Sequence, residues 1–404
     1  MRAEAEPMNP VIANESELYI APGGPTYRLV ERILAAYNIK PSIARRIVVL
    51  FLVTWAPMCV FALVQGVALG DTPTGSFLLD LPTYVRYFFL IPVLVLMERL
   101  VGDRLRTAGL QFLRDGLVRQ EDYPAFEQAI ARLARRRESV IAGLVVLAFA
   151  LLGPWRLTYE SASGVGLVGW QSVTLPEGHA FRYNLAALWS HFIALPVLLF
   201  LGYRWLWRIL FWTLFLRDIA RLNLRLIPTH ADRAGGLGFL ELAHDSFGIF
   251  AFAIGTTFSS LAAYRVLFEG QQLDFFQMPT LIVLVAVLVL SLGPMMVFTP
   301  ILSRTRREAL LYYGSMVIGY NRDFEDKWRK DSGPQNPELL GSSDIQSLAD
   351  LGNSYRFVME MGYMPFGKRA VIYQVVMAPL PALPLILLVV PMSQIRDVLS
   401  KVAF

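Results

Sequence analysis

Residues 280–302 read TLIVLVAVLVLSLGPMMVFTPIL, and this stretch decides the class of fold. It carries no charged side chain and is long enough to cross a bilayer core as a helix, which takes about 20 mostly apolar residues. Other runs reach a similar length. They are Ile47–Leu69, Pro82–Leu100, Val140–Leu157, Tyr183–Tyr203 or a little beyond, Phe247–Phe268 and Ala370–Val390. We therefore predict an all-α polytopic integral membrane protein with about seven transmembrane helices.

The composition supports this class. The chain has 404 residues, of which 55% are hydrophobic and 17% charged, whereas a soluble domain carries about 25% charge. The net charge is +5, but the basic residues lie beside apolar runs and not on one amphipathic face, so we expect the lipid bilayer and not nucleic acid as the partner. Cys59 is the single cysteine, which excludes a disulfide framework and a Cys-based metal site.

The distribution of Lys and Arg predicts the orientation. Of the 37 basic residues, 29 lie in the N-terminal segment and in the connections that follow the runs Pro82–Leu100, Tyr183–Tyr203 and 280–302. Basic loops stay in the cytoplasm, so we expect a cytoplasmic N-terminus in a plasma or bacterial inner membrane. The last run contains Pro379, Pro381 and Pro384. It either crosses with a kink, which places the C-terminal tail outside, or re-enters, which places the tail inside.

These runs divide the chain into eight segments. The membrane segments are transmembrane helices 1 and 2 (47–100), 3 and 4 (140–216), 5 and 6 (247–302), and a Pro-rich transmembrane or re-entrant helix with a tail (370–404). The cytoplasmic segments are an N-terminal segment with an interfacial helix at Thr26–Asn38 (1–46), a helical segment (101–139), a Gly-rich turn region (217–246) and a second helical segment (303–369).

The cytoplasmic connections have helical patterns. Pro124–Arg137 starts with a proline in its first turn and ends in a run of arginines. A second helix starts at Ser343, which has capping-box spacing to Gln346. Between the helices, Lys330–Gly341 is typical of a loop. We therefore predict a small helical cytoplasmic layer.

Charges within apolar runs call for partners. Arg204 and Arg208 are four residues apart and therefore share a helical face. If the helix enters the membrane late in its apolar run, both lie near mid-depth and require Glu98, Glu241 or an anionic ligand. If it enters early, both lie at the cytoplasmic interface among tryptophans. Arg204, Arg208, Glu98 and Arg86 are our hypothesis for a ligand or ion pathway; the alternative is that Arg86 snorkels outward and Glu98 forms a salt bridge.

The cytoplasmic turn at 228–238 is a second candidate. Its glycines permit close backbone approach, and a helix that starts there would offer free N–H groups to an anion. The hypothetical anion or ligand turn consists of His230, Asp232, Arg233, Gly235 and Gly236. The alternative is a tight, capped turn between two helices.

Metal binding has only weak support. His230, Asp232, His244 and Asp245 are weak candidate ligands, because their spacing matches no compact metal motif. No cofactor is evident.

Several function classes are excluded or left open. The chain has no Walker A sequence, no His-Glu-x-x-His motif and no Gly-x-Ser-x-Gly elbow, which argues against an ATP-driven pump and the commonest protease and esterase mechanisms. Short extracytoplasmic loops and prolines in apolar runs favour a channel or transporter for an ion or small solute. The alternatives are a membrane sensor or scaffold whose cytoplasmic layer docks a protein partner, and a lipid-active membrane enzyme.

The plan of seven crossings, with the N-terminus inside and helices prolonged into the cytoplasm, resembles the insect odorant and gustatory receptor type of ligand-gated channel in topology and length. This resemblance implies a channel that forms a homo-oligomer. No residue motif carries it, so it assigns no functional residue.

Overall fold

The computed structural model describes residues 18, 42–72, 74–162, 169–174, 181–329 and 343–389. The predicted interfacial helix at Thr26–Asn38, the predicted loop at Lys330–Gly341 and the C-terminal tail lie outside the described residues.

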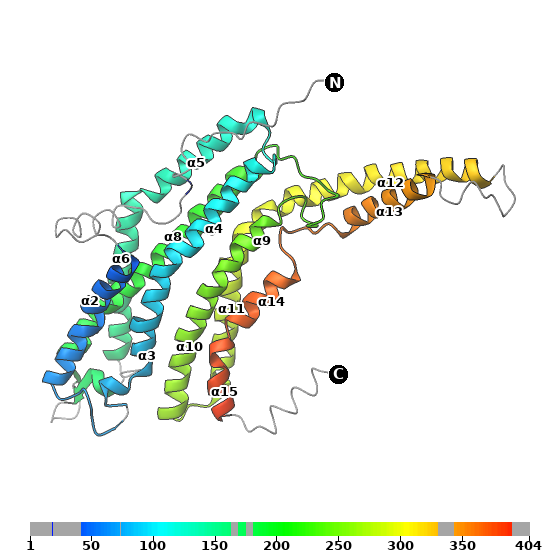
Figure 1. Cartoon of the computed structure of the whole chain (residues 1–404). Coiled ribbons are helices and arrows are strands. Elements are labelled where there is room, and N and C mark those ends of the chain that lie inside the picture. Colours follow the sequence, from blue (N-terminus) through cyan, green and yellow to red (C-terminus); the bar gives the residue numbers. More distant parts are fainter. Residues whose placement is uncertain are drawn as a thin grey trace.

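The fold is helical (Figure 1). The first half contains α2 (Ile43–Val64), α3 (Leu81–Tyr84), α4 (Ile91–Arg114), α5 (Tyr123–Arg137), α6 (Val140–Ala162), α7 (Leu185–Trp189) and α8 (Leu195–Ala220). The second half contains α9 (Phe239–His244), α10 (Gly248–Phe268), α11 (Gln277–Leu292), α12 (Thr299–Arg329), α13 (Ser343–Glu360), α14 (Lys368–Met377) and α15 (Leu383–Val389). Two π-helical turns, Val85–Leu90 and Ser190–Ala194, lead directly into α4 and α8.

One small sheet interrupts the helical fold. Strand β1 (Ser172–Thr174) pairs antiparallel with β2 (Phe181–Tyr183), with Val173 opposite Arg182. The prediction of an all-helical chain missed this hairpin, because the strands are too short to show a two-residue period of hydrophobicity.

Five helical segments among the described residues are long and apolar enough to cross a membrane. They are Ile43–Val64, Leu185–Ala220, Phe239–Phe268, Leu273–Trp328 and Lys368–Val389. A sixth is reached if the bent pair Gln120–Arg137 and Val140–Pro154 counts as one span. The predicted span Pro82–Leu100 falls within α3, the π-helical turn and α4, which are not among the five. The chain is thus compatible with a membrane protein, and the count of seven stays a prediction.

Two helix groups and an arm make up the molecule (Figure 1). In one group α2, α4, α6 and α8 run side by side, and in the other α10 and α11 pack with the segment α14–α15. The apolar stretch 280–302 does not form one helix: α11 ends at Leu292, a 3₁₀ turn covers Gly293–Phe298, and α12 starts at Thr299 with Pro300 in its first turn. Helix α12 then leaves the bundle, and α13 packs back along it. We call α12 and α13 the arm.

Aromatic side chains fill the junction between the groups. Phe112 of α4 and Phe298 stack with ring centroids 5.9 Å apart, and Phe239 of α9 meets Phe112 edge to face at 5.0 Å. All three lie where α4, α9 and the 3₁₀ turn before α12 converge. Such contacts fix the helices against one another, because aromatic pairs prefer these offset geometries.

The helices predicted for the two longest connections are confirmed as helices. The predicted Pro124–Arg137 corresponds to α5, and α13 starts at the predicted Ser343. Their assignment to a cytoplasmic layer stays a prediction.

Candidate functional site

A cluster of buried charges joins three helices. Glu98 of α4 accepts from Arg208 of α8, with 2.7 Å between Oε1 and Nη2, and its Oε2 lies 2.8 Å from Nη1 of Arg46 in α2. The Glu98 and Arg208 side chains are each 5% exposed, and that of Arg46 is 14% exposed. We call Glu98, Arg208 and Arg46 the charge cluster.

An aromatic side chain covers the charge cluster. The guanidinium of Arg208 lies 5.0 Å from the centroid of the Trp205 ring, and the indole N–H of Trp205 donates to the carbonyl of Leu94 at 3.0 Å. Arg204, the second predicted arginine, places its guanidinium 5.8 Å from the ring of Phe200. The tryptophan therefore closes the α4–α8 interface around the ion pair, where a cation and a π face attract each other.

The partner of Arg208 is Glu98. Glu241, the other candidate, accepts from the backbone N–H of Gly367 at 2.8 Å. Arg46 lies in the first turn of α2, so the charge cluster is level with the start of that apolar helix. Both carboxylate oxygens of Glu98 face arginines. The cluster can therefore clamp α2, α4 and α8 together.

Arg86, the fourth residue of the predicted pathway, does not contribute to the charge cluster. It lies half-buried in the π-helical turn Val85–Leu90, before α4 begins. The structure therefore brings together Glu98 and Arg208, adds Arg46, and places Arg86 elsewhere.

A polar cluster near that turn was missed by the sequence reasoning. The buried carboxylate of Asp80 accepts from the hydroxyl of Thr83 at 2.7 Å and from the indole N–H of Trp170 at 2.9 Å. Asn184 donates its side-chain amide to the carbonyl of Trp170. These bonds fasten the segment around the β1–β2 hairpin to α3. Only the Asp80–Thr83 spacing was visible in the sequence, because Trp170 is 90 residues away.

The glycine turn binds its own carboxylate. Asp232 Oδ1 accepts from the backbone N–H of Ala234 at 2.8 Å and of Gly236 at 3.2 Å, and Oδ2 accepts from Gly238 at 2.8 Å. His230 Nδ1 lies 2.9 Å from Oδ1. The hypothesis of free N–H groups for an external anion is therefore wrong for these three amides, because the side chain of Asp232 already occupies them.

The turn is also fixed to the arm. Arg233, at φ 56°, pairs with Glu360 at the end of α13 at 2.9 Å, and its carbonyl accepts from Gly362 at 2.7 Å. Gly235 and Gly236 adopt φ of 66° and 96°, which a side chain would strain. The capped-turn alternative therefore describes this region.

The electrostatics of the turn follow from these bonds. Burial raises the pKa of the Asp232 carboxyl, but the backbone amides that donate to it stabilise the ionised form and hold its pKa below the ordinary value.

The four weak metal candidates do not gather into one site. His244 is buried: its Nδ1 lies 2.9 Å from the carbonyl of Leu240, and its Nε2 accepts from the indole N–H of Trp212 at 3.3 Å. Asp245 pairs with Arg369 at 2.8 Å. Among the described residues, no group of three His, Cys, Asp or Glu side chains is close enough to hold a metal ion. His230 and Asp232 face each other, whereas His244 and Asp245 face Trp212 and Arg369.

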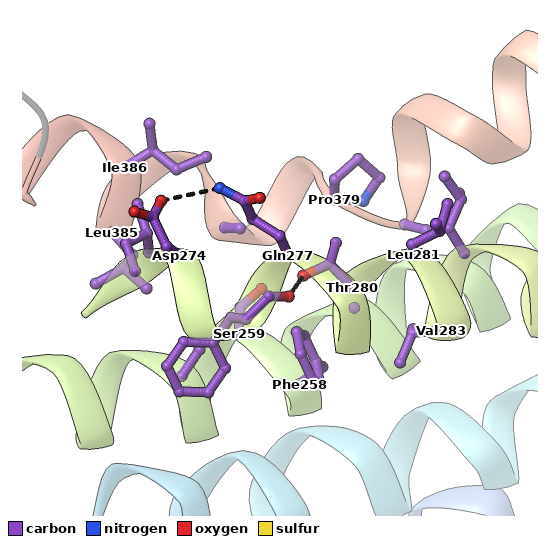
Figure 2. A pocket seen from close by; sticks show the side chains of 17 residues that line it. Phe258, Ser259, Asp274, Gln277, Thr280, Leu281, Val283, Pro379, Leu385 and Ile386 are labelled. Atoms are coloured by element: carbon purple, nitrogen blue, oxygen red, sulfur yellow. Dashed lines mark hydrogen bonds between the residues drawn. The ribbon is translucent and has the colours of Figure 1, made fainter. Parts of the chain in front are cut away.

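The last apolar segment is discontinuous and borders a cavity (Figure 2). Helix α14 ends at Met377, a 3₁₀ turn covers Leu380–Ala382, and α15 starts at Leu383. A cavity of about 450 Å³ lies between this segment, α10 and α11. Gly255 of α10 permits the close approach, because a Cβ there would lie 1.8 Å from the carbonyl oxygen of Ala378.

A second cavity of about 510 Å³ lies between α4 and α9. Its lining mixes both signs of charge and includes Asp103, Arg104 and Asp245. Because carboxylates and an arginine line this cavity together, its charges favour neither an anionic nor a cationic ligand.

No family model, no curated protein and no solved structure matches this chain.

Proposed function

We propose that the chain is a multi-pass membrane channel or transporter for an ion or small solute. The observation that carries the proposal is the discontinuous segment α14–α15. Three prolines, Pro379, Pro381 and Pro384, remove backbone donors from an otherwise apolar stretch. Non-helical backbone at membrane depth is tolerated where it is buried in protein or lines a cavity, and transporters use broken helices at their substrate sites.

Two further irregularities support the proposal. The π-helical turns Val85–Leu90 and Ser190–Ala194 interrupt apolar helices, and such bulges are frequent at functional sites. They give the helix group of α2, α4 and α8 the capacity for local rearrangement, while the charge cluster holds its other end.

The topology that we propose has seven crossings, a cytoplasmic N-terminus and a plasma or bacterial inner membrane. The eight segments predicted from the sequence remain part of this proposal. It places the charge cluster at the cytoplasmic ends of the helices, because Arg46 is in the first turn of α2. It also places the arm and the glycine turn in the cytoplasm and the β1–β2 hairpin outside.

Ion and dye flux across liposomes tests the proposal. Purified full-length protein is compared with the triple variant Pro379→Ala, Pro381→Ala and Pro384→Ala, which permits a continuous helix, and with Pro57→Ala, which changes a proline within α2. We expect flux above empty liposomes from the wild type and from Pro57→Ala, and altered flux from the triple variant. Absence of flux for several ions, pH values and voltages would contradict the proposal.

The second candidate function is a membrane scaffold, which is supported by exposed apolar side chains on the arm. Leu311 is 74% exposed and Tyr312 62% exposed on α12, next to exposed Ile318. Apolar side chains on a segment rich in charge indicate a protein contact. We propose that the arm packs against a second copy of the chain, which makes a homo-oligomer.

The oligomeric state tests this second proposal. Light scattering after size-exclusion chromatography in detergent should show an oligomer for the wild type and for Asn321→Asp, a charge added at another exposed arm position. Leu311→Asp should give a monomer. A monomeric wild type would leave a cytoplasmic protein partner as the explanation for the exposed surface.

A further inference from the structure

The cavity beside the broken segment has the dimensions of a ligand site. Its volume of about 450 Å³ falls in the range of about 300–1,000 Å³ found for small-molecule pockets. Gln277 and Leu284 both line it and are separated by about 10 Å along α11, at 1.5 Å per residue. The cavity is therefore long enough for an extended chain.

Its walls are apolar along most of this length. Phe258, Ala262, Leu284, Leu385 and Ile386 belong to the lining (Figure 2). The hydroxyl of Thr280 is occupied, because it donates to the carbonyl of Phe276 at 2.6 Å. Such walls offer an aliphatic chain contacts that water cannot match.

The carboxylate and amide side chains of the lining lie at one end, and the buried Ser259 also lines the cavity. Asp274 and Gln277 are exposed there, and the amide Nε2 of Gln277 donates to Oδ1 of Asp274 at 2.9 Å. The connection 269–279 contains Glu269 and Asp274 but neither Lys nor Arg. A cationic head would be attracted to this end, whereas a carboxylate or phosphate would be repelled.

The cavity also opens sideways. Leu281 lines it and is 52% exposed, and Pro379 on the opposite wall is exposed as well. In the proposed topology this opening faces the lipid, so an amphiphile can enter from the bilayer.

We propose that this cavity binds an amphiphile with one aliphatic chain in the groove and a cationic head at Asp274. Either a free long-chain amine or one chain of an amine-headed lipid supplies this chemistry. The inference rests on the proposed membrane topology, but binding requires no conduction, so labelling without flux would leave it standing.

Photolabelling tests the inference on the full-length protein in phosphatidylcholine nanodiscs. Three probes carry the same alkyl diazirine chain: a long-chain amine, the matched carboxylate, and a diacyl lipid with the same amine head. Labelled positions are mapped by peptide mass spectrometry. We expect the amine to label the cavity lining in preference to the carboxylate. Labelling by the diacyl probe as well would identify a bilayer lipid as the source, and its absence a free amphiphile.

Two variants with matched controls complete the test. Ala382→Trp fills the cavity and should reduce its labelling by about tenfold, which corresponds to 1.4 kcal/mol, while Ala286→Trp on the exposed side of α11 should not. Asp274→Asn should lower the preference for the amine by about fivefold, as expected for one exposed ion pair, through weaker amine labelling and no loss of carboxylate labelling. Asp71→Asn, at an exposed carboxylate that does not line the cavity, is its control.

The inference is overturned by any of three results. These are labelling spread evenly over lipid-facing residues, equal labelling by amine and carboxylate, and cavity labelling that survives Ala382→Trp. Asp274 is exposed, so its variant is expected to fold and keeps the test valid if Ala382→Trp does not fold.

Discussion

The charge cluster and the arm each contain an ion pair between arginine and glutamate, but the two pairs contribute differently to stability. In the cluster, Glu98 and Arg208 are each 5% exposed and lie on different helices of the bundle. On the arm, Arg304 and Glu308 are 79% and 63% exposed, and both lie on α12. Water screens the attraction between Arg304 and Glu308, so this exposed pair contributes little to stability. Glu98 and Arg208 have lost their hydration, so each of these buried charges depends on its partner. The distance is 2.8 Å or less in both, so burial and not distance decides what each pair contributes.

The largest expected effect comes from breaking the charge cluster. Glu98→Gln would remove the counter-charge that Arg208 faces at 2.7 Å and one partner of Arg46, and should lower the stability by about 3–5 kcal/mol. Thermal unfolding in detergent measures this loss. Partial restoration by an added Arg208→Met would confirm that the buried charge of Arg208 causes much of the loss, and a Tm of Glu98→Gln equal to that of the wild type would contradict the clamp.

Two glycine-to-alanine substitutions compare how tightly the bundle and the arm are packed. Gly255→Ala in the bundle places a Cβ against the carbonyl of Ala378 and should cost about 1–3 kcal/mol. Gly319→Ala on the arm meets no atom within 4 Å and should stabilise the helix by about 0.5–1 kcal/mol. Denaturant unfolding of both variants gives the signs. A neutral Gly255→Ala would show that α14 can move away from α10.

The glycine turn that joins bundle and arm should respond to pH. The pKa of Asp232 is lower in the folded chain than in the unfolded chain, so its stabilising effect is present above the unfolded pKa of about 3.9 and is lost as the pH falls through the folded pKa. Asp232→Ala should therefore destabilise by about 1 kcal/mol near neutral pH and by less in acid. Hydrogen exchange of the amides at Ala234 and Gly238 provides a local measurement; equal exchange in both proteins at pH 7 would refute the assignment.

The smallest effect is expected on the arm. Glu308→Gln removes the partner of Arg304 and should leave the Tm unchanged within error, because both side chains are hydrated. A clear loss of stability would show that the arm is buried against another chain in solution, which would support the proposed oligomer.

Local patterns predicted the helices well and their partners poorly. Pro124 lies in the first turn of α5 and α13 starts at Ser343, because the residue preferences at a helix start act within one turn. Pairing Glu98 with Arg208 was among the predicted choices, but Arg46 was not, since it reaches Glu98 only through the packing of α2 on α4. The sequence leaves Asp232 either in a ligand turn or in a capped turn, and the folded turn directs its carboxylate to the amides beside it.

The sequence by itself determined that this is a helical chain with several apolar segments, because length and hydrophobicity are properties of each segment alone. Tertiary structure decided which charges pair, how closely the broken segment approaches α10 at Gly255, and where a cavity remains between α10, α11 and α14–α15. These features arise from contacts between segments far apart in the chain, and a local pattern carries no information about which distant side chain will meet it.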